Sequence, residues 1–265
     1  MKSLLFLLPL LLLLTACEEV IQLDLDSAGP HLVAEANLDA THGTCTLKLT
    51  RSGDFYQNNT FETIEGAQAV LRLAGAEYAL SEEESGLYRL SGLTPLPGDT
   101  AALRFVLPDG QTVESKVAVV PSAVPLDTLF VEKNATAGGP GGASENYLLT
   151  AEWQDEAGQE NYYRLKIDRN GGFLSDLYLL ADDRLGDGTR ISRPVIRQSF
   201  AQADVLRVQL LSTSRDYYDY FTDLANADGR GLAAPAPYNP KSNWTGETLG
   251  YFGVWQVSEA TIEVK

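Results

Sequence analysis

The sequence of 265 residues has little sulfur, little histidine and little positive charge. It contains two cysteines, one methionine, two histidines, and 20 lysines and arginines against 36 aspartates and glutamates. A zinc enzyme needs clustered His or Cys ligands, and two histidines without a helical pair do not supply them. We therefore expect no metal and no cofactor. No basic block is present to replace phosphate counterions, which argues against nucleic acid as a partner.

The sequence also lacks an apolar run long enough to span a membrane. The run from Leu4 to Leu14 follows Lys2, and its length is that of a secretory signal (roughly 7–15 residues) rather than that of a spanning helix (roughly 20). It ends at Thr15 and Ala16, which are small enough for a peptidase groove, followed by Cys17, whose thiol can accept a diacylglycerol. The pattern predicts a lipoprotein signal peptide over 1–16, cleaved between Ala16 and Cys17, and lipidation of Cys17.

Lipidation would hold the mature chain on a membrane despite its acidity. The net charge of −16 becomes −17 when Lys2 leaves with the signal, so acyl chains such as palmitate must provide the attachment, at about 0.8 kcal/mol per buried methylene. The acidic stretch 17–30 is predicted to be a lipidated tether, with an early edge strand as the alternative. The other cysteine, Cys45, lies in an alternating stretch and is interpreted as a small buried hydrophobe.

The rest of the chain has the pattern of an all-β (mainly β) protein. From 31 to 120, about seven short apolar runs alternate with turn signals, which is typical of an Ig-like or transthyretin-like β-sandwich. Leu107–Gln111 contains Pro-Asp-Gly between two alternating runs and predicts a hairpin. The prolines around 121–125 predict a domain boundary.

Residues 126–265 predict a second β-rich, sandwich-like domain with one short helix. Strands are expected at 128–132, 147–153, 162–167, 173–180, 195–200 and 206–211, and a closing strand through Phe252, Val254 and Val257. The helix is predicted at about 214–225, because Ser214 can cap it and Asp216 favours its first turn. We expect its apolar face to pack on the second sheet, with Phe252 and Trp255 in the core of that domain.

Ordered short motifs run through the whole mature chain. They are Cys17-Glu18, Leu32-Val33-Ala34-Glu35, Leu47–Ser52, Glu65–Val70, Gly86-Leu87-Tyr88, Trp153-Gln154-Asp155, Asn161–Arg164, Tyr217–Tyr220 and Gly250–Gly253. In this order the motifs resemble the Bacteroidota lipoproteins described as domain of unknown function 4249 (DUF4249). The sequence departs from the family in the loop from Arg230 to Gly246, where Asn243 and Gly246 fit the usual pattern only loosely.

The resemblance implies a two-part β-rich lipoprotein of the outer membrane that is often encoded beside a TonB-dependent receptor. It brings no catalytic residues. Glu18 and Glu19 resemble the signal that sends such lipoproteins to the outer face of that membrane. The expected location is therefore the outer membrane, lipid-anchored and facing the cell exterior.

A search for catalytic and metal-binding patterns gives few candidates. No nucleophile elbow, phosphate-binding loop or dinucleotide fingerprint is present. A dispersed Ser-His-acid site would need His31 or His42. Asp182, Asp183 and Asp187 could hold a hard cation, but Arg184 competes for their charge and we favour a solvated turn.

Aromatic residues gather in the last fifth of the chain and suggest a binding surface. Tyr218, Tyr238 and Trp244 lie outside the expected apolar face of the helix, so they are the candidates for binding a small ligand or a partner, with burial in the core as the alternative.

Together these observations favour a non-enzymatic surface lipoprotein that captures ligand for, or assists, a TonB-dependent (SusC-like) transporter in nutrient uptake. Two alternatives stay open: a structural or adhesive surface module, and a hydrolase with a dispersed site.

Overall fold

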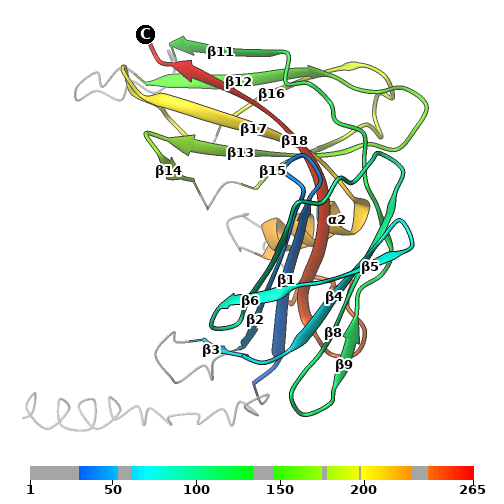
Figure 1. Ribbon diagram of the computed structural model, residues 1–265. Helices are drawn as coiled ribbons and strands as arrows, with labels where there is room; N and C mark the ends of the chain where they lie inside the picture. Colours follow the sequence, from blue (N-terminus) through cyan, green and yellow to red (C-terminus); the bar gives the residue numbers. More distant parts are fainter. Residues whose placement is uncertain (1–29, 53–60, 134–145, 175–177, 197, 228–237) are drawn as a thin grey trace, which may run out of the picture.

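The computed structural model describes residues 30–52, 61–133, 146–174, 178–196, 198–227 and 238–265 (Figure 1). The described part is mainly β with one helix, as the sequence predicted. The predicted signal peptide, the tether up to residue 29 and the motif at Cys17, Glu18 and Glu19 lie outside the described residues. Within them, no helix is long and apolar enough to cross a membrane.

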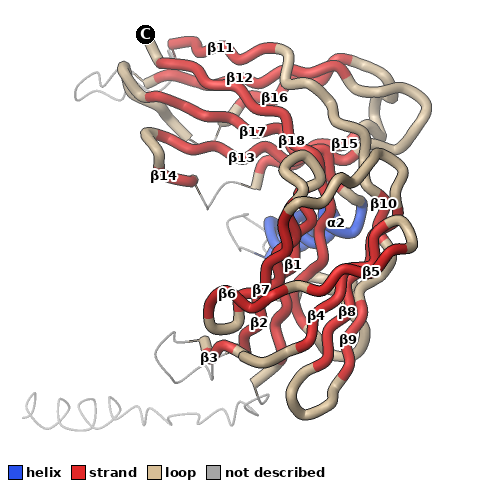
Figure 2. Tube along the Cα trace, viewed as in Figure 1, coloured by secondary structure: helices blue, strands red, loops and turns tan. Residues whose placement is uncertain are grey.

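The strands form two lobes that meet near the helix (Figure 2). The first lobe is a sandwich, because alternate residues of two sheets pack into one core. One sheet contains β1 (Leu32–Asp39), β2 (Thr44–Arg51), β3 (Glu62–Thr63), β6 (Ser81–Glu84) and β7 (Leu87–Ser91). The other contains β4 (Gln68–Leu73), β5 (Ala76–Ala79), β8 (Thr100–Val106), β9 (Thr112–Glu114) and β10 (Ala118–Val119).

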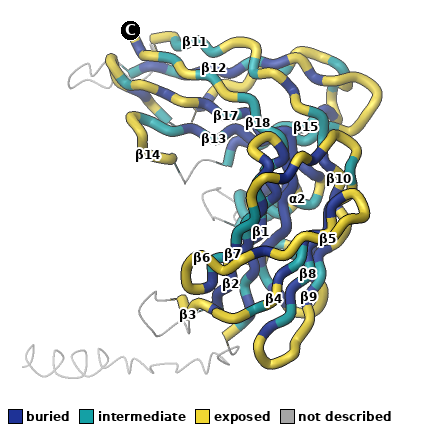
Figure 3. Tube along the Cα trace, in the orientation of Figure 1, coloured by how far each residue is buried: buried dark blue, intermediate teal, exposed yellow. Residues whose placement is uncertain are grey.

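The strand pattern explains which residues face this core. In β1 the even-numbered residues Leu32, Ala34, Ala36 and Leu38 are buried and the odd-numbered ones are half-buried. The hairpin predicted at Leu107–Gln111 is confirmed, since Val106 pairs with Thr112. By contrast, β5 and β6 are exposed along their whole length (Figure 3).

The second lobe has its own core between two further sets of strands. A three-stranded sheet contains β11 (Thr128–Lys133), β12 (Tyr147–Gln154) and β16 (Arg190–Pro194). It packs on β13 (Tyr162–Arg169), β14 (Gly172–Phe173), β15 (Leu179–Asp182), β17 (Val205–Thr213) and part of β18 (Leu249–Glu263).

One long strand joins the lobes. Residues 255–263 of β18 pair antiparallel with β17 in the second lobe, whereas residues 249–255 pair parallel with β1 in the first. The large sheet therefore continues from β14 through β18 to β6. The domain boundary at 121–125 stays a prediction. The last strand of the chain, β18, pairs with a strand of each lobe, so the first lobe contains residues from both sides of that boundary.

This pairing corrects the expected place of Phe252. The sequence placed it in the core of the second domain, whereas it is fully buried in the first core, 6.2 Å from the ring of Trp244. The reason is the alternation along β18: Phe252 and Val254 face the sandwich, and Tyr251 and Trp255 face the helix.

The helix, α2 (Arg215–Ala227), agrees with the predicted 214–225 to within two residues. It lies against β18 where the lobes meet (Figure 1). Tyr217 and Phe221 are buried there, as expected from their helical spacing. Gly253 of β18 makes the close approach possible, because any side chain at this position would collide with the ring of Tyr217.

Several strand boundaries differ from the prediction. The strand expected at 195–200 is instead β16, which ends at Pro194. The strand expected at 173–180 is not continuous: β14 ends at Phe173 and β15 begins at Leu179, with 175–177 outside the described part.

Candidate functional site

A recess of about 370 Å³ lies between the lobes, a volume in the range of small-molecule sites. Its walls are residues 117–122 with Gly98 from the first lobe, and 159–162 and 213–216 from the second. The segment 213–216 is where β17 passes into α2. The recess therefore lies where the two lobes meet, and the sequence alone did not predict which residues come together there.

Two charged residues of this recess, Glu160 and Arg215, are exposed and paired with each other. Arg215 Nη1 lies 3.3 Å from Glu160 Oε2, and the Tyr162 hydroxyl donates to the same oxygen at 2.7 Å. Burial and the Glu160 carboxylate raise the pKa of Tyr162 to about 12. Exposed ion pairs of this kind contribute about 0–1 kcal/mol, so a ligand can rearrange them at little cost.

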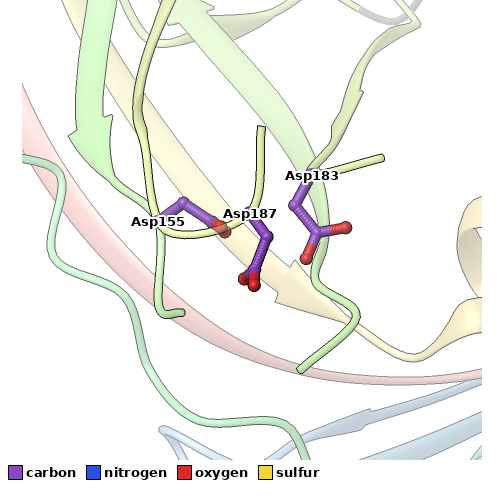
Figure 4. Close-up of side chains that lie close together, drawn as sticks. All are labelled: Asp155, Asp183 and Asp187. Carbon is purple, nitrogen blue, oxygen red and sulfur yellow. The ribbon is translucent and has the colours of Figure 1, made fainter. Parts of the chain in front are cut away.

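Next to this recess, three aspartates bring their carboxylates together (Figure 4). One oxygen each from Asp155, Asp183 and Asp187 lies within 4.8 Å of the others. Asp155 follows β12 and Asp183 follows β15, and both are buried, whereas Asp187 is exposed. Residues 158–160 line a second, open recess together with Asp183, Arg184 and Asp187.

The three carboxylates also form hydrogen bonds between two segments, residues 155–161 and residues 183–188. Asp155 accepts hydrogen bonds from the Tyr163 hydroxyl (2.5 Å) and the Gly188 N–H (2.8 Å). Asp183 accepts the Asn161 N–H (2.9 Å) and Asp187 the Gly158 N–H (2.8 Å). Burial and the Asp155 carboxylate raise the pKa of Tyr163 well above its usual value.

This geometry revises the interpretation of the acidic loop. The preferred solvated turn fits Asp187, but it is wrong for Asp183, which is 7% exposed. Arg184 does compete for charge as expected, because it pairs with Asp182 at 2.6 Å. Oxygen ligands suit Ca²⁺, yet the same oxygens are explained by the hydrogen bonds above. Asp155 was missed because it lies 28 residues before Asp183 in the sequence.

A second cluster lies under α2 and centres on Arg164 of β13. This arginine is 5% exposed. Its guanidinium carbon stands 3.7 Å from the centre of the Phe221 ring, and its Nη1 donates to the Tyr217 hydroxyl at 2.6 Å. A cation over a ring in such a desolvated place gains about 2 kcal/mol.

Arg164 nevertheless leaves part of its bonding capacity unused. Its Nε is buried without a hydrogen-bond partner, and an unsatisfied buried donor costs about 1–3 kcal/mol. Within the described part of the chain it forms no ion pair. The local sequence does not indicate this, because Arg164 lies in an alternating strand, where such a residue is expected to face solvent.

The same face of β13 carries a second basic residue, Lys166. Its ammonium lies 4.8 Å from the centre of the Trp255 ring and makes no salt bridge to any described residue. Burial lowers the pKa of Lys166 to about 8, and the neighbouring charge of Arg164 adds to the effect. Lys166 and Arg164 therefore form a pair of basic groups walled by aromatic rings.

Two of the three predicted binding aromatics are part of the interior. Tyr218 is 8% exposed and donates to Asp182 at 2.6 Å. Trp244 is 6% exposed, and its Nε1 donates to the backbone oxygen of Ala34 at 2.9 Å. Only Tyr238 of the three is exposed, at 41%. The structure does not bring the three together, and their role in binding stays a prediction.

Asn243 and Thr245, on either side of Trp244, form hydrogen bonds to both sheets of the first lobe. The side-chain amide of Asn243 donates to the Phe252 oxygen and accepts the Phe252 N–H, at 2.9 and 2.8 Å. On the other side, the backbone N–H of Thr245 donates to the Glu114 oxygen at 2.9 Å. This is the segment in which the sequence departs from the usual family pattern.

The two histidines lie at opposite ends of β1. His31 precedes the strand, and His42 follows it, where its Nδ1 lies 2.8 Å from Asp39 Oδ2. The eight residues of β1 span roughly 26 Å, so the two rings cannot share one site. Cys45 is fully buried, as predicted, and burial raises the pKa of its thiol to about 12.

Comparison with known proteins identifies one family. A family model described as "Domain of unknown function (DUF4249)" matches residues 18–261, which confirms the family predicted from the ordered motifs. The comparison with curated proteins finds no match. The family match covers both lobes, the helix and the two clusters described above.

Proposed function

This chain belongs to the DUF4249 family, and we propose that it is a lipid-anchored outer-membrane protein that faces the cell exterior. In this proposal it acts without catalysis, as an accessory or ligand-capturing partner of a TonB-dependent transporter in nutrient uptake. The observation that carries the proposal is the sequence Leu14-Thr15-Ala16-Cys17 after a short apolar run. The acidic pair Glu18 and Glu19 supports the outward orientation.

The number of residues between Cys17 and the described fold is compatible with a lipid anchor at Cys17. The described fold begins at Pro30, 13 residues after Cys17 (30 − 17). A stretch of that length reaches at most about 45 Å, so the first lobe would stay close to the membrane surface. The recess between the lobes offers a ligand-sized space on such a tethered molecule.

The anchor is tested by metabolic labelling with an alkyne analogue of palmitate. We expect label on the wild-type protein and none on Cys17→Ser, which should also leave the membrane fraction. Cys45→Ser is the matched control and should keep both the label and the fraction. Equal labelling of the wild type and Cys17→Ser would contradict the proposal.

The partnership is tested by purification of a tagged chain in mild detergent. We expect a large outer-membrane receptor to copurify in repeated preparations, and a deletion strain to lose uptake of a specific nutrient. Repeated recovery of the lipoprotein alone would refute the partnership. Normal growth with impaired attachment to surfaces would instead support an adhesive module.

A further inference from the structure

The anchor and the transporter partnership leave two basic residues of β13 unexplained, the buried Arg164 and the half-buried Lys166. Arg164 is held between β13 and the helix, with its guanidinium carbon 3.7 Å from the centre of the Phe221 ring and 5.9 Å from that of Tyr178. A guanidinium is positively charged at every accessible pH. A buried charge of this kind is normally neutralised by a carboxylate or another anion.

The hydrogen bonds of Arg164 show which side of the guanidinium is free. Nη1 is occupied by the Tyr217 hydroxyl. Neither Nε nor Nη2 makes a hydrogen bond to any described residue, and Nε is fully buried. Nε and Nη2 form the planar fork that donates two parallel hydrogen bonds to the oxygens of a carboxylate. Arg164 therefore presents its binding edge without an occupant from the described chain.

A second unpaired cation strengthens the case. Lys166 lies two residues further along β13, on the same face, and its ammonium rests against Trp255. Glu35 of β1 lies on the same sheet face but forms no ion pair with Arg164 or Lys166 within the described residues. In a chain with 36 acidic and 20 basic residues, it is unusual that neither the buried Arg164 nor the half-buried Lys166 forms an ion pair with a described carboxylate. Asp39 and Asp168 lie near enough to Lys166 only to oppose the lowering of its pKa.

We propose that Arg164 and Lys166 form a binding site for a small organic carboxylate with a flat apolar body. Its carboxylate would take the Nε–Nη2 fork of Arg164 with Lys166 as a second positive charge. Its apolar body would pack among the rings of the cluster. In this proposal the ligand would enter past Tyr178 and Tyr220, which are half-buried and pack against the cluster. The proposal concerns the folded chain alone and does not depend on the anchor or the transporter.

The surroundings favour this class over other ligands. The walls are aromatic side chains, namely Tyr178, Tyr217, Phe221, Tyr251 and Trp255, which suit a flat apolar body better than a fully hydrated inorganic ion. Two cations exclude a metal ion. A neutral aromatic compound would fill the apolar space but leave the fork of Arg164 unsatisfied.

The test measures binding of benzoate to the full chain in mild detergent, by calorimetry and by the shift in melting temperature. Benzyl alcohol, which has the same ring without the charge, and sulfate are the comparison ligands. The variants are Arg164→Met, Arg164→Lys and Lys166→Met. Arg193→Met is the matched control, because Arg193 is exposed on β16 and forms no ion pair with any described residue.

We expect saturable benzoate binding that raises the melting temperature of the wild type. Arg164→Met and Arg164→Lys should bind about 10- to 100-fold more weakly, since both remove the fork. Lys166→Met should weaken binding about 3- to 10-fold, and Arg193→Met by less than about twofold.

Three results would overturn the proposal. They are the absence of saturable binding to folded wild type at about 10 mM benzoate, unchanged affinity in folded Arg164→Lys, and equal protection by sulfate or benzyl alcohol. If Arg164→Met does not fold, Arg164→Lys and Lys166→Met decide the question, because both keep a long side chain in place. The receptor purification has no bearing on these outcomes, so the two proposals fail separately.

Discussion

Trp244 offers a direct test of how the first lobe is held together. The sequence suggests a ligand-binding aromatic, whereas the structure shows a buried side chain that joins two sheets. Its ring lies 5.4 Å from that of Phe105 in an edge-on arrangement, and its Nε1 donates to Ala34 of β1. If this is its main role, replacing it must lower the free energy of unfolding.

The size of the effect follows from burial. Removal of a buried tryptophan side chain costs about 3–5 kcal/mol, because transfer and cavity terms add. For a folded part of this size, 1 kcal/mol corresponds to about 2–4 °C, so Trp244→Ala should lower the melting temperature by about 6–20 °C. Trp244→Phe keeps most of the apolar volume and loses the hydrogen bond, which costs about 1–3 kcal/mol.

The assay is urea and thermal unfolding followed by circular dichroism. Tyr238→Ala is the control, since Tyr238 is exposed and should change stability by less than about 0.5 kcal/mol. A fall of under about 2 °C for Trp244→Ala, with an unchanged urea dependence, would refute the structural role. Loss of ligand binding without loss of stability would restore the binding role predicted from the sequence.

Three further predictions follow from single residues. Gly250→Ala should cost more than about 2 kcal/mol in urea unfolding, because φ is +93° and a side chain would collide with the facing backbone of β1; Gly246→Ala, at φ +72° in open space, should cost about half as much or less. Cys45 should resist iodoacetamide at about pH 8 until the chain is unfolded, since burial raises the pKa of its thiol to about 12; equally fast labelling of native and unfolded protein would exclude this. Hydrogen bonds from Arg184, then Tyr218, lower the pKa of Asp182, so its contribution to stability is present above about pH 4 and is lost as the pH falls through the lowered value; acid titration of stability should be flatter for Asp182→Asn, and identical curves would contradict the assignment.

The strands and the helix were largely predictable because their signals are local. Apolar runs located β12, β13 and β17, and Pro-Asp-Gly located the hairpin after β8. The helix was located by apolar residues at helical spacing. Errors arose where a strand changes partner or ends, as at β16 and between β14 and β15, since pairing in a sheet is not encoded by spacing along the chain.

The candidate sites were much less predictable. Asp155 and Asp183 meet because β12 and β15 end near one another, and nothing in either local sequence indicates this. Arg164 and Lys166 alternate with core residues along β13 and so resemble solvent-facing positions. Arg164 is covered because α2 folds onto that face, which the amphipathic pattern of the helix alone does not specify.

The sequence by itself determined the class of fold, the helix α2, the family and the expected lipid attachment of Cys17, because each depends on a pattern within a few residues or on the order of short motifs. Only the tertiary structure decided that β18 belongs to both lobes, that Phe252 and Trp244 lie in the first core, and which charges face one another. The physical reason is that strand pairing and burial depend on contacts between residues far apart in the chain, and a short pattern is compatible with several such arrangements.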